Sequence, residues 1–467
     1  MTAITRELSE FVTGITYDAL PANVRDRAKA LVFDAVGNMV RARNDAESTA
    51  SMVSAIAKLG LNGGTCTVLG DSAGYTPPGA AMLNGTLAHS LDFDDTHASG
   101  SIHPSAPIVA AAFAAAEMTG TDGKTLIAAI VAGYETQIRL SLALDPAKHY
   151  DQGFHPTATC GAFGAAAAAC RLMRADAATT ASAFGIVLSM SAGSMQFLVN
   201  GAWTKRSHVG HAAMCGVIAA TLAGEGYKGP SEALEGKWGF LHAYSPASQP
   251  ARVTEGLGRR WETMKIAIKP YPSCRYTHAA IDGLVALTKQ HSIRPEDVEE
   301  VVVGLPEPGW KITGDPEPAK QAPKNVVDGQ FSMPFCASVA LRTGNLGWDD
   351  YAMHLGDAAT LALCKKVQTR VDAKAQADFP EEMSANVKLT TRNGTFETYV
   401  RTPKGEPSNF LTADELRAKF DALTSPYLSA RRRDELANAL LGLENAKDIA
   451  GVLRLARPET GAQRAAA

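Results

Sequence analysis

The chain has 467 residues, of which 46% are hydrophobic, and a formal net charge of −3 with histidine neutral. This length exceeds that of one ordinary hydrophobic core, so we expect two domains, and the nearly balanced charge gives no electrostatic reason to expect nucleic acid or a membrane surface as a partner. The sequence begins without the pattern of a signal peptide, lacks a long uninterrupted apolar run and has seven cysteines without a CxxC pair, so we expect a reduced, cytoplasmic protein.

Helical patterns dominate from the beginning to about residue 265. The stretch "PANVRDRAKALVFDAVGNMVRAR" (21–43) begins with a proline and places Ala28, Val32, Ala35 and Met39 on one face. A second helix is predicted over 122–144, after an Asp-Gly start. Because small side chains allow helices to approach closely, we expect tight helix packing at the alanine-rich tracts, which are 110–116, 162–170 and 211–224.

Strand signals enter after Lys269. "VEEVVVGLP" (Val298–Pro306) predicts a strand, and alternation on both sides of Asn393-Gly394 predicts a hairpin. Helices are expected between them, over Phe335–Arg342 and Ala358–Val367. Residues 268–405 therefore form a predicted smaller α+β domain.

The stretches after residue 405 return to helical patterns, and each is too small to bury a core of its own. We therefore expect residues 406–467 to rejoin residues 1–267. The predicted fold class is mainly α, with a large all-helical domain built from both chain ends plus a smaller α+β lid domain. The tail beyond Pro458 is expected to be frayed.

The segment "AHSLDFDDTHASGSIHPSAP" (88–107) gathers three histidines and three aspartates in an apolar region. If Asn84–Thr96 is helical, His89, Asp92 and Thr96 share a face. Asp94 and Asp95 then point elsewhere, towards caps or a neighbouring helix. His103-Pro104-Ser105 predicts a proline-led start of the next helix.

Three interpretations of this segment stay open on the residues alone. Histidine and aspartate at helical spacing bind zinc, manganese or iron, although no recognised ligand spacing is present. In the structural interpretation the aspartates are caps and the histidines are satisfied polar contacts. The third interpretation is a metal-free site for acid–base chemistry on a carboxylate.

Further segments favour the third interpretation. "KHYDQGFHPTATCGAFGAA" (148–166) repeats the His-Pro helix entry at His155, and helix N-termini suit carboxylates. "GAWTKRSHVGHAA" and "MKIAIKPYPSCRYTHAAID" place more cationic or titratable groups at such junctions, namely Lys205, Arg206, His208, Lys269, Arg275 and His278. A solvated surface role remains the alternative for each. No phosphate-binding glycine loop is present, and Cys274 is interpreted as a pocket wall residue.

Taken together with "NGTLAHSLDFDDTH", "HPSAP" and "GQFSMPF", these motifs resemble the MmgE/PrpD superfamily, which contains 2-methylcitrate dehydratase, cis-aconitate decarboxylase and iminodisuccinate epimerase. The resemblance implies a homodimer without metal or organic cofactor and an active site between two domains. It implies pocket positions that match those of decarboxylase-like members, which are Asp92, Thr96, His103, His155, Lys205 and Lys269. Two departures from the decarboxylases are Cys274, where animal members carry a further histidine, and a loop one residue longer between Thr96 and His103.

We therefore expect a lyase that removes a proton next to a carboxylate of a small polycarboxylate, of the 2-methylcitrate dehydratase or cis-aconitate decarboxylase type. The expected catalytic residues are His103, His155, Lys269, Asp92 and Tyr150. The expected substrate-binding residues are Thr96, Lys205, His208, Cys274 and Arg275. One alternative is an isomerase, in which the resemblance to the epimerases would make Tyr150 and Lys269 opposed bases. Another is a non-catalytic polycarboxylate-binding protein.

Overall fold

The computed structural model describes residues 3–199 and 202–459. These residues divide into two compact units, one made of the residues up to Ala267 and from Ala413 onward, the other of Ile268–Thr412. The chain is mainly helical, as the sequence predicts. The part of the predicted frayed tail from residue 460 on lies outside the described residues.

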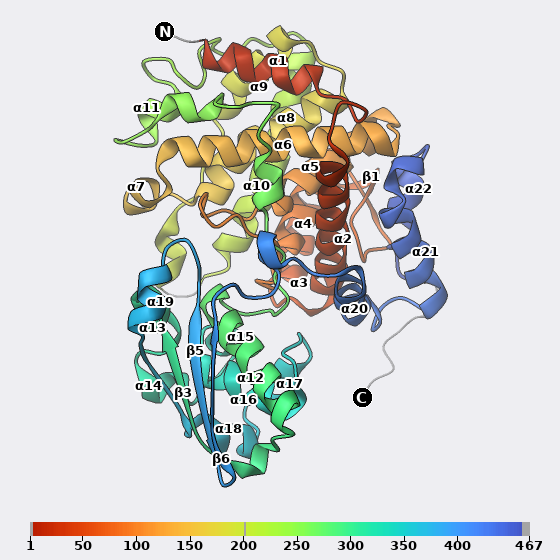
Figure 1. Cartoon of the computed structure of the whole chain (residues 1–467). Coiled ribbons are helices and arrows are strands. Elements are labelled where there is room, and N and C mark those ends of the chain that lie inside the picture. Colours follow the sequence, from red (N-terminus) through yellow and green to blue (C-terminus); the bar gives the residue numbers. More distant parts are fainter. Residues whose placement is uncertain (1–2, 200–201, 460–467) are drawn as a thin grey trace. The chain divides into compact units, whose positions relative to one another are not determined.

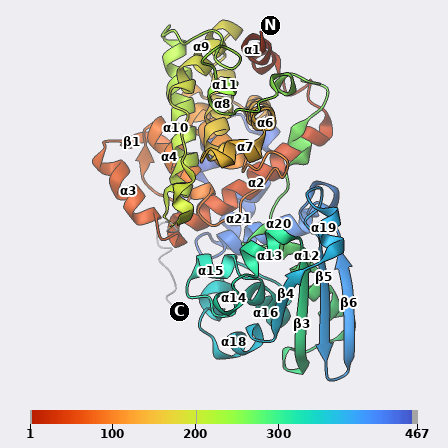
Figure 2. The same ribbon diagram turned by 90° about the vertical axis from the view of Figure 1, so that its left-hand side faces the viewer.

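Helices form most of the first unit (Figures 1 and 2). Most helices that the sequence predicts here are found, including the one that begins after Pro21 and buries Ala28, Val32, Ala35 and Met39. In chain order the helices are α1 (Ile4–Gly14), α2 (Ala22–Asp45), α3 (Thr49–Lys58), α4 (Pro77–Ala88), α5 (Ser105–Thr119), α6 (Gly123–Leu144), α7 (Pro146–Asp151), α8 (Pro156–Leu172), α9 (Ala177–Leu188), α10 (Thr204–Gly224), α11 (Phe240–Ala243), α20 (Ala413–Thr424), α21 (Ala430–Leu441) and α22 (Ile449–Arg454).

The alanine-rich tracts lie in α5, α8 and α10, which pack closely together and against α4. Ala110, Ala165 and Ala213 meet in one buried cluster. The closest approach is at Gly210 of α10, where a Cβ atom would lie 2.2 Å from the backbone oxygen of Met82 in α4. The predicted close packing is confirmed, and it brings the N-terminal ends of α8 and α10 near the loop after α4.

Helix α6 is long and apolar enough to cross a membrane by length and composition alone, which the sequence analysis did not anticipate. Almost all of its apolar window is buried inside the protein. It also carries a fully buried ion pair, in which Arg139 Nε lies 2.9 Å from Glu135 Oε2. Both observations fit the core helix of a globular unit.

The prediction that this unit is all-helical is wrong in one detail. Strands β1 (Asn62–Thr67) and β2 (Gly74–Tyr75) form an antiparallel ribbon. Its close approach depends on glycine, because a Cβ at Gly64 would lie 2.2 Å from the backbone oxygen of Tyr75. Glycine-rich strands carry little alternation of apolar and polar residues, so the pattern that predicts strands is missing here.

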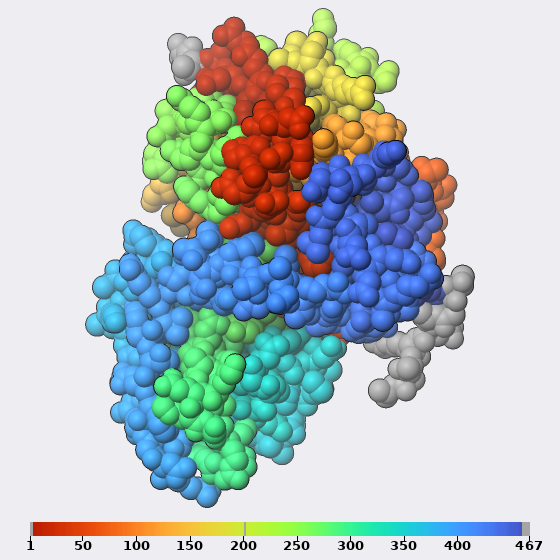
Figure 3. All heavy atoms as spheres, turned by 45° about the vertical axis from the view of Figure 1, so that its right-hand side comes forward, coloured from red at the N-terminus to blue at the C-terminus, as the bar shows by residue number. Residues whose placement is uncertain are grey.

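The C-terminal helices pack against the N-terminal part of the same unit. Helices α20 and α21 contact α2, and Figure 3 shows these blue elements beside red N-terminal ones on one face. The rings of Phe33 and Phe420 stack with centroids 4.2 Å apart. Lys419 of α20 reaches inward, and its Nζ lies 2.6 Å from Asp34 Oδ1.

The second unit is built on a four-stranded sheet of order β4-β3-β5-β6, in which β3 and β4 are parallel and the other pairs antiparallel. The strand from Val298 and the hairpin at Asn393-Gly394 are confirmed. The strands are β3 (Val298–Leu305), β4 (Val367–Val371), β5 (Ala385–Thr391) and β6 (Gly394–Val400), and the helices are α12 (His278–His291), α13 (Glu307–Thr313), α14 (Glu317–Lys320), α15 (Val326–Gln330), α16 (Met333–Thr343), α17 (Asp350–His354), α18 (Ala358–Cys364) and α19 (Ala373–Asp378).

One element of the second unit was misassigned at its end. The helix predicted over Ala358–Val367 ends at Cys364, and Val367 opens β4. Strand β4 is short and half exposed, and it exists because it pairs with β3, whose residues are more than 60 positions away in the sequence. Local periodicity does not report a long-range pairing of this kind.

Candidate active site

The polar segment between α4 and α5 is a loop. Helix α4 ends at Ala88, so the predicted helix over Asn84–Thr96 is wrong beyond that residue. Asp92 has a left-handed backbone, with a φ of 52°, which a right-handed helix does not accommodate. Side chains of aspartate and serine compete with helical hydrogen bonds, and several in this loop find partners elsewhere. His89, Asp92 and Thr96 therefore share no helical face.

Backbone hydrogen bonds fix this loop. Thr96 and Ala267 form an antiparallel bridge, with N–H···O distances of 2.9 Å from Thr96 to Ala267 and 2.8 Å in the other direction. His97 donates its N–H to the oxygen of Ile102 at 2.8 Å. The loop is thus held in a set shape, as a site with fixed side chains requires.

Asp94 lies at the centre of the ionisable groups of the loop. Its Oδ2 is 2.7 Å from His89 Nδ1 and 3.2 Å from His103 Nδ1. Burial favours the neutral acid, but the two imidazoles outweigh it and hold the pKa of Asp94 well below its usual value. The prediction that Asp94 points away from the site is wrong, because it rested on the helix that does not form.

Asp95 turns the other way and caps α5, as the sequence predicts. Ser105 donates its N–H to Asp95 Oδ1 at 3.1 Å and its hydroxyl to Oδ2 at 2.6 Å. Burial raises the pKa of Asp95 well above its usual value, although the Ser105 hydrogen bonds oppose this. The pKa values of these two adjacent carboxyl groups are therefore driven in opposite directions.

Four imidazole rings of the first unit form a row in which each ring lies near the next. The ring centroids are 4.5 Å apart for His103 and His89, 6.0 Å for His89 and His155, and 5.6 Å for His155 and His208. His155 is the N-cap of α8, and His208 lies in the first turns of α10. Burial lowers the pKa of His89 to about 4, lowers that of His155 well below its usual value, and lowers that of His208. These three rings are therefore neutral at neutral pH, with lone pairs that can accept protons.

Lys205 supplies positive charge beside the imidazoles. Its Nζ lies 3.5 Å from Asp92 Oδ1. Burial would lower the pKa of Lys205, but Asp92 and Asp94 raise it above its usual value, so the side chain is a cation. Tyr150 donates its hydroxyl to the oxygen of Ser101 at 3.3 Å, and burial raises the pKa of its phenol.

The predicted residues fall into two groups. Asp92, His103, His155, Lys205 and His208 are connected in the first unit by the contacts above or by electrostatic coupling. Thr96 and Tyr150 belong to the same unit. Lys269, Cys274 and Arg275 belong to the second unit. The residues that the sequence analysis left out of the site are His89 and Asp94.

The second-unit residues lie on a loop that is held from within that unit. Pro272 O accepts hydrogen bonds from Gln330 Nε2 at 3.1 Å and from the Tyr351 hydroxyl at 2.8 Å. Cys274 donates its N–H to the backbone oxygen of Gln330 at 2.9 Å. Arg275 forms an ion pair with Glu406, so its charge has a protein partner. Gln330 belongs to the motif "GQFSMPF", whose contribution is to shape the loop that carries Lys269.

His89, Asp94 and His103 offer ligand atoms within 4.8 Å of one another, so their composition could suit a metal ion. Ligands of a tetrahedral zinc ion with bonds near 2.05 Å lie about 3.3 Å apart. The 2.7 Å between His89 Nδ1 and Asp94 Oδ2 is shorter than this and matches a charge-assisted N–H···O hydrogen bond. The arrangement around Asp94 therefore fits proton sharing better than metal ligation through these atoms.

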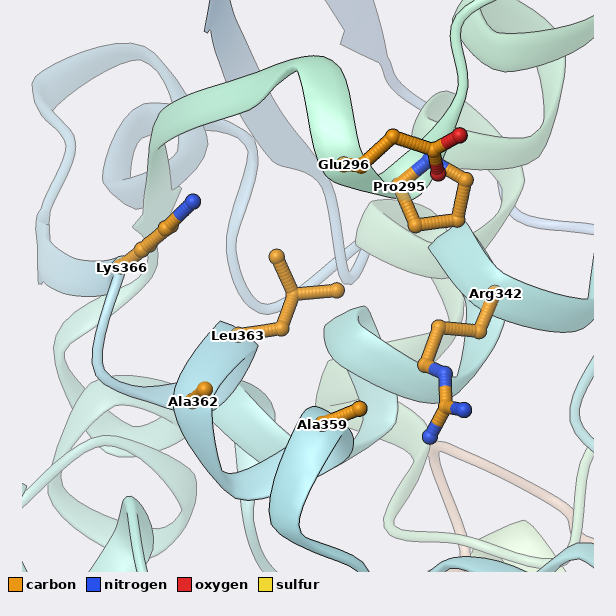
Figure 4. A pocket seen from close by; sticks show the side chains of 7 residues that line it. All are labelled: Pro295, Glu296, Arg342, Ala359, Ala362, Leu363 and Lys366. Carbon is orange, nitrogen blue, oxygen red and sulfur yellow. The ribbon is translucent and has the colours of Figure 1, made fainter.

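A hollow of about 510 Å³ lies in the second unit (Figure 4). Its lining residues are Pro295, Glu296, Arg342, Ala359, Ala362, Leu363 and Lys366. Its two cations have partners, since Arg342 pairs with Asp357 and Lys366 Nζ donates to the oxygen of Val298 at 2.6 Å. The hollow offers neither a histidine nor a cation without a partner, so we do not place the acid–base chemistry there.

Two protein-family models match the chain. The MmgE/PrpD N-terminal domain matches residues 6–252, and the MmgE/PrpD C-terminal domain matches residues 271–443. The histidine cluster lies in the first range, and Lys269 falls between the two.

Similarity to individual proteins extends over nearly the whole chain. A cis-aconitate decarboxylase-like protein of Aspergillus oryzae is 28% identical, covering 97% of this chain and 97% of the relative. The cis-aconitate decarboxylase of Aspergillus terreus is 25% identical, and the similarity covers 97% of this chain and 95% of the relative. The cis-aconitate decarboxylase of Mus musculus is 26% identical, and the similarity covers 97% of this chain and 93% of the relative.

Proposed function

The chain belongs to the MmgE/PrpD family, and on that premise we propose that it is a cofactor-independent lyase acting on a small polycarboxylate. The reaction begins at a carbon next to a carboxylate, by loss of a proton or of carbon dioxide. The observation that carries this proposal is the cluster of His89, His103 and His155 with Asp94, coupled electrostatically to the Lys205 cation.

Each part of this group meets a requirement of the chemistry. A base that removes a proton from carbon must be neutral at working pH, and the lowered pKa values of His89 and His155 keep those rings neutral. A carboxylate substrate and the enolate-like charge that develops on it need a fixed cation. Lys205 provides one, held by Asp92. The N-terminus of α8, capped by His155, adds partial positive charge.

The names of the relatives favour a tricarboxylate as the first substrate to test, since cis-aconitate decarboxylases match over nearly full length. In a decarboxylation the bond between the carboxylate carbon and its neighbour breaks, the electron pair stays on the substrate, and carbon dioxide leaves. His103, which we propose takes up a proton on Nε2 when the carboxylate substrate binds, then gives that proton to carbon. Dehydration uses the same groups, with the base removing the carbon-bound proton and an acid protonating the leaving hydroxyl.

The isomerase alternative needs Tyr150 as one of two bases. Its phenol is a weak base in this setting, because it is protonated at neutral pH, burial raises its pKa further and its hydroxyl already donates to Ser101. We therefore place Tyr150 in the pocket wall. Lys269 of the second unit remains a proposed catalytic residue, and a homodimer remains a prediction from the family.

The test is proton NMR of the purified protein with cis-aconitate, citrate and 2-methylcitrate, each offered separately in deuterated water. We expect one of them to lose carbon dioxide or water. His103→Ala should reduce that turnover by at least about 100-fold, the usual contribution of a general acid or base. The matched control is His242→Ala, which removes an exposed histidine of α11 in the same unit. If no polycarboxylate reacts, or if both variants retain full turnover, the proposal is wrong.

A further inference from the structure

A single carboxylate oxygen serves two imidazoles in this site. Asp94 Oδ2 is the atom closest to both His89 Nδ1, at 2.7 Å, and His103 Nδ1, at 3.2 Å. The side chains are almost fully buried for His89 and Asp94, while 16% of the His103 side chain is exposed. The function proposed above gives Asp94 no part in orienting the imidazoles and treats His89 only as one of the neutral rings.

The contacts determine where the ring protons are. An ionised carboxylate only accepts hydrogen bonds, so an imidazole nitrogen that faces it must carry a hydrogen. A neutral imidazole has one N–H, and when this is on Nδ1 the lone pair is on Nε2. His89 Nδ1 meets this condition with a hydrogen bond, whereas His103 Nδ1 lies at ion-pair distance from Asp94 Oδ2 without the geometry of a hydrogen bond. The negative charge of Asp94 nevertheless favours a hydrogen on the nearest nitrogen of each ring, and so the same tautomer for both. Each ring presents its Nε2 lone pair on the side away from Asp94.

His89 Nε2 gives a second, independent observation. It is a buried atom without a hydrogen-bond partner among the residues that the structure describes, and so is Asp94 Oδ1. Buried polar atoms nearly always find a partner, so two such atoms on neighbouring residues indicate a place where a water molecule or a substrate group binds. The His89 ring also stands edge-on to His103, with centroids 4.5 Å apart.

We propose that Asp94 is a positioning residue that fixes both His89 and His103 as Nδ1–H tautomers, so that the two Nε2 atoms act together as proton acceptors facing the substrate. His103, the more exposed ring, exchanges a proton with the reacting carbon. His89, the deeper ring, accepts a hydrogen bond from a hydroxyl, a protonated carboxyl group or a water molecule. The kinetic part of this proposal rests on the proposed function, and the tautomer part does not.

The tautomers can be measured without a substrate. Two-bond ¹H–¹⁵N correlation spectra of protein labelled on its 11 histidines distinguish Nδ1–H from Nε2–H rings. The variants His89→Gln and His103→Gln assign the two signals by removing one each. We expect the Nδ1–H form for both rings near neutral pH. An Nε2–H form for either ring in the unsubstituted protein would overturn the proposal, and this result needs no Asp94 variant to fold.

Asp94→Asn adds the kinetic test. Asparagine keeps the side-chain volume but removes the negative charge and, when its amide nitrogen faces the rings, the acceptor for their Nδ1–H groups, so the hold on the two tautomers is weakened. By analogy with asparagine substitutions of orienting aspartates, kcat should fall by about 10²- to 10⁴-fold, with KM changed by less than about 5-fold. Turnover within about 3-fold of the original would overturn the proposed role of Asp94.

The matched control is Asp95→Asn, since Asp95 is the adjacent buried carboxyl group and contacts Ser105 instead of a histidine. We expect this variant to leave both tautomer signals in place. Loss of the signals in both variants would mean that the loop, and not Asp94, sets the tautomers, which contradicts the proposal. If both tautomers are as expected but no polycarboxylate reacts, the proposed function fails and the assignment of tautomers stands.

Discussion

Lys419 connects the C-terminal helix α20 to the loop that carries the site, and Lys419→Met should destabilise the first unit. The ammonium group donates to the backbone oxygen of Phe93 at 2.8 Å and lies 2.6 Å from Asp34 Oδ1. Phe93 stands between Asp92 and Asp94. Methionine keeps most of the side-chain volume and removes the charge, so the variant tests the polar contacts alone.

The magnitude follows from the burial of both partners. Only 6% of the Lys419 side chain and 2% of the Asp34 side chain are exposed. Removing one partner of a buried pair costs about 3–5 kcal/mol. Burial raises the pKa of Asp34 to about 6 even with Lys419 beside it, so in the variant the carboxyl group takes up a proton at neutral pH. Because this protonation removes the unpaired buried charge, the expected loss in the free energy of unfolding lies at the lower end of the range, about 3 kcal/mol at pH 7.

The assay is urea unfolding followed by circular dichroism, with turnover measured on the same samples. Lys148→Met is the control, because Lys148 is 54% exposed and 3.8 Å from Asp151, and its removal should cost less than about 1 kcal/mol. Adding Asp34→Asn to Lys419→Met should recover more than about 1 kcal/mol, since no buried acid is then left without its cation. A loss of less than about 1 kcal/mol for Lys419→Met would refute the reasoning.

Three further predictions concern other parts of the chain. The pKa of His89 is lowered from 6.5 to about 4, so between these pH values the unfolded state binds the proton and the folded state does not. The free energy of unfolding should therefore fall as the pH drops through this window. His89→Gln should reduce that fall by up to about 3 kcal/mol when unfolding is measured from pH 7 to pH 4. Gly210→Ala would place a Cβ 2.2 Å from Met82 O and 2.3 Å from Thr86 Oγ1, so thermal unfolding should show a loss of stability of about 3 kcal/mol. Gly224→Ala is the control, because a Cβ at this end of the same helix meets nothing within 4 Å, and it should show no loss of stability. Gln330→Leu and Tyr351→Phe each remove one of the two donors to Pro272 O, so each should lower the free energy of unfolding in urea by about 1 kcal/mol. The double variant should lose more than the sum of the two single losses, because the carbonyl is then left without either donor. Additive losses would contradict this.

Much of the architecture could be predicted because it depends on local patterns. The helix that begins after Pro21 and the hairpin at Asn393-Gly394 follow from side-chain periodicity and turn chemistry, which act over a few residues. The elements that were missed depend on distant partners. Strand β4 exists through its pairing with β3, and the ribbon of β1 and β2 depends on glycine backbones that approach closely.

The candidate site divides in the same way. The His-Pro junctions at His103 and His155 are visible in the sequence as helix entries, and both residues lie in the imidazole cluster. The central position of Asp94 was not visible, because the helical spacing assumed for the segment turns its side chain away. Only the loop geometry, with Asp92 in a left-handed conformation and Phe93 O bound by Lys419, brings Asp94 between two histidines.

The pair Asp94-Asp95 shows why the sequence could mark this segment as a candidate functional site but could not assign a role to each acid. Both side chains are buried, and two ionised carboxylates on adjacent residues would repel each other. Their surroundings separate them: imidazoles hold the pKa of Asp94 low, whereas burial raises the pKa of Asp95 against the opposing hydrogen bonds from Ser105. Neighbouring acids whose environments drive their pKa values apart are the arrangement that lets one fold run acid and base steps together. In this chain the separation comes from His89 and His103, which lie against Asp94 and leave Asp95 to the effect of burial, in a loop whose shape the sequence alone does not reveal.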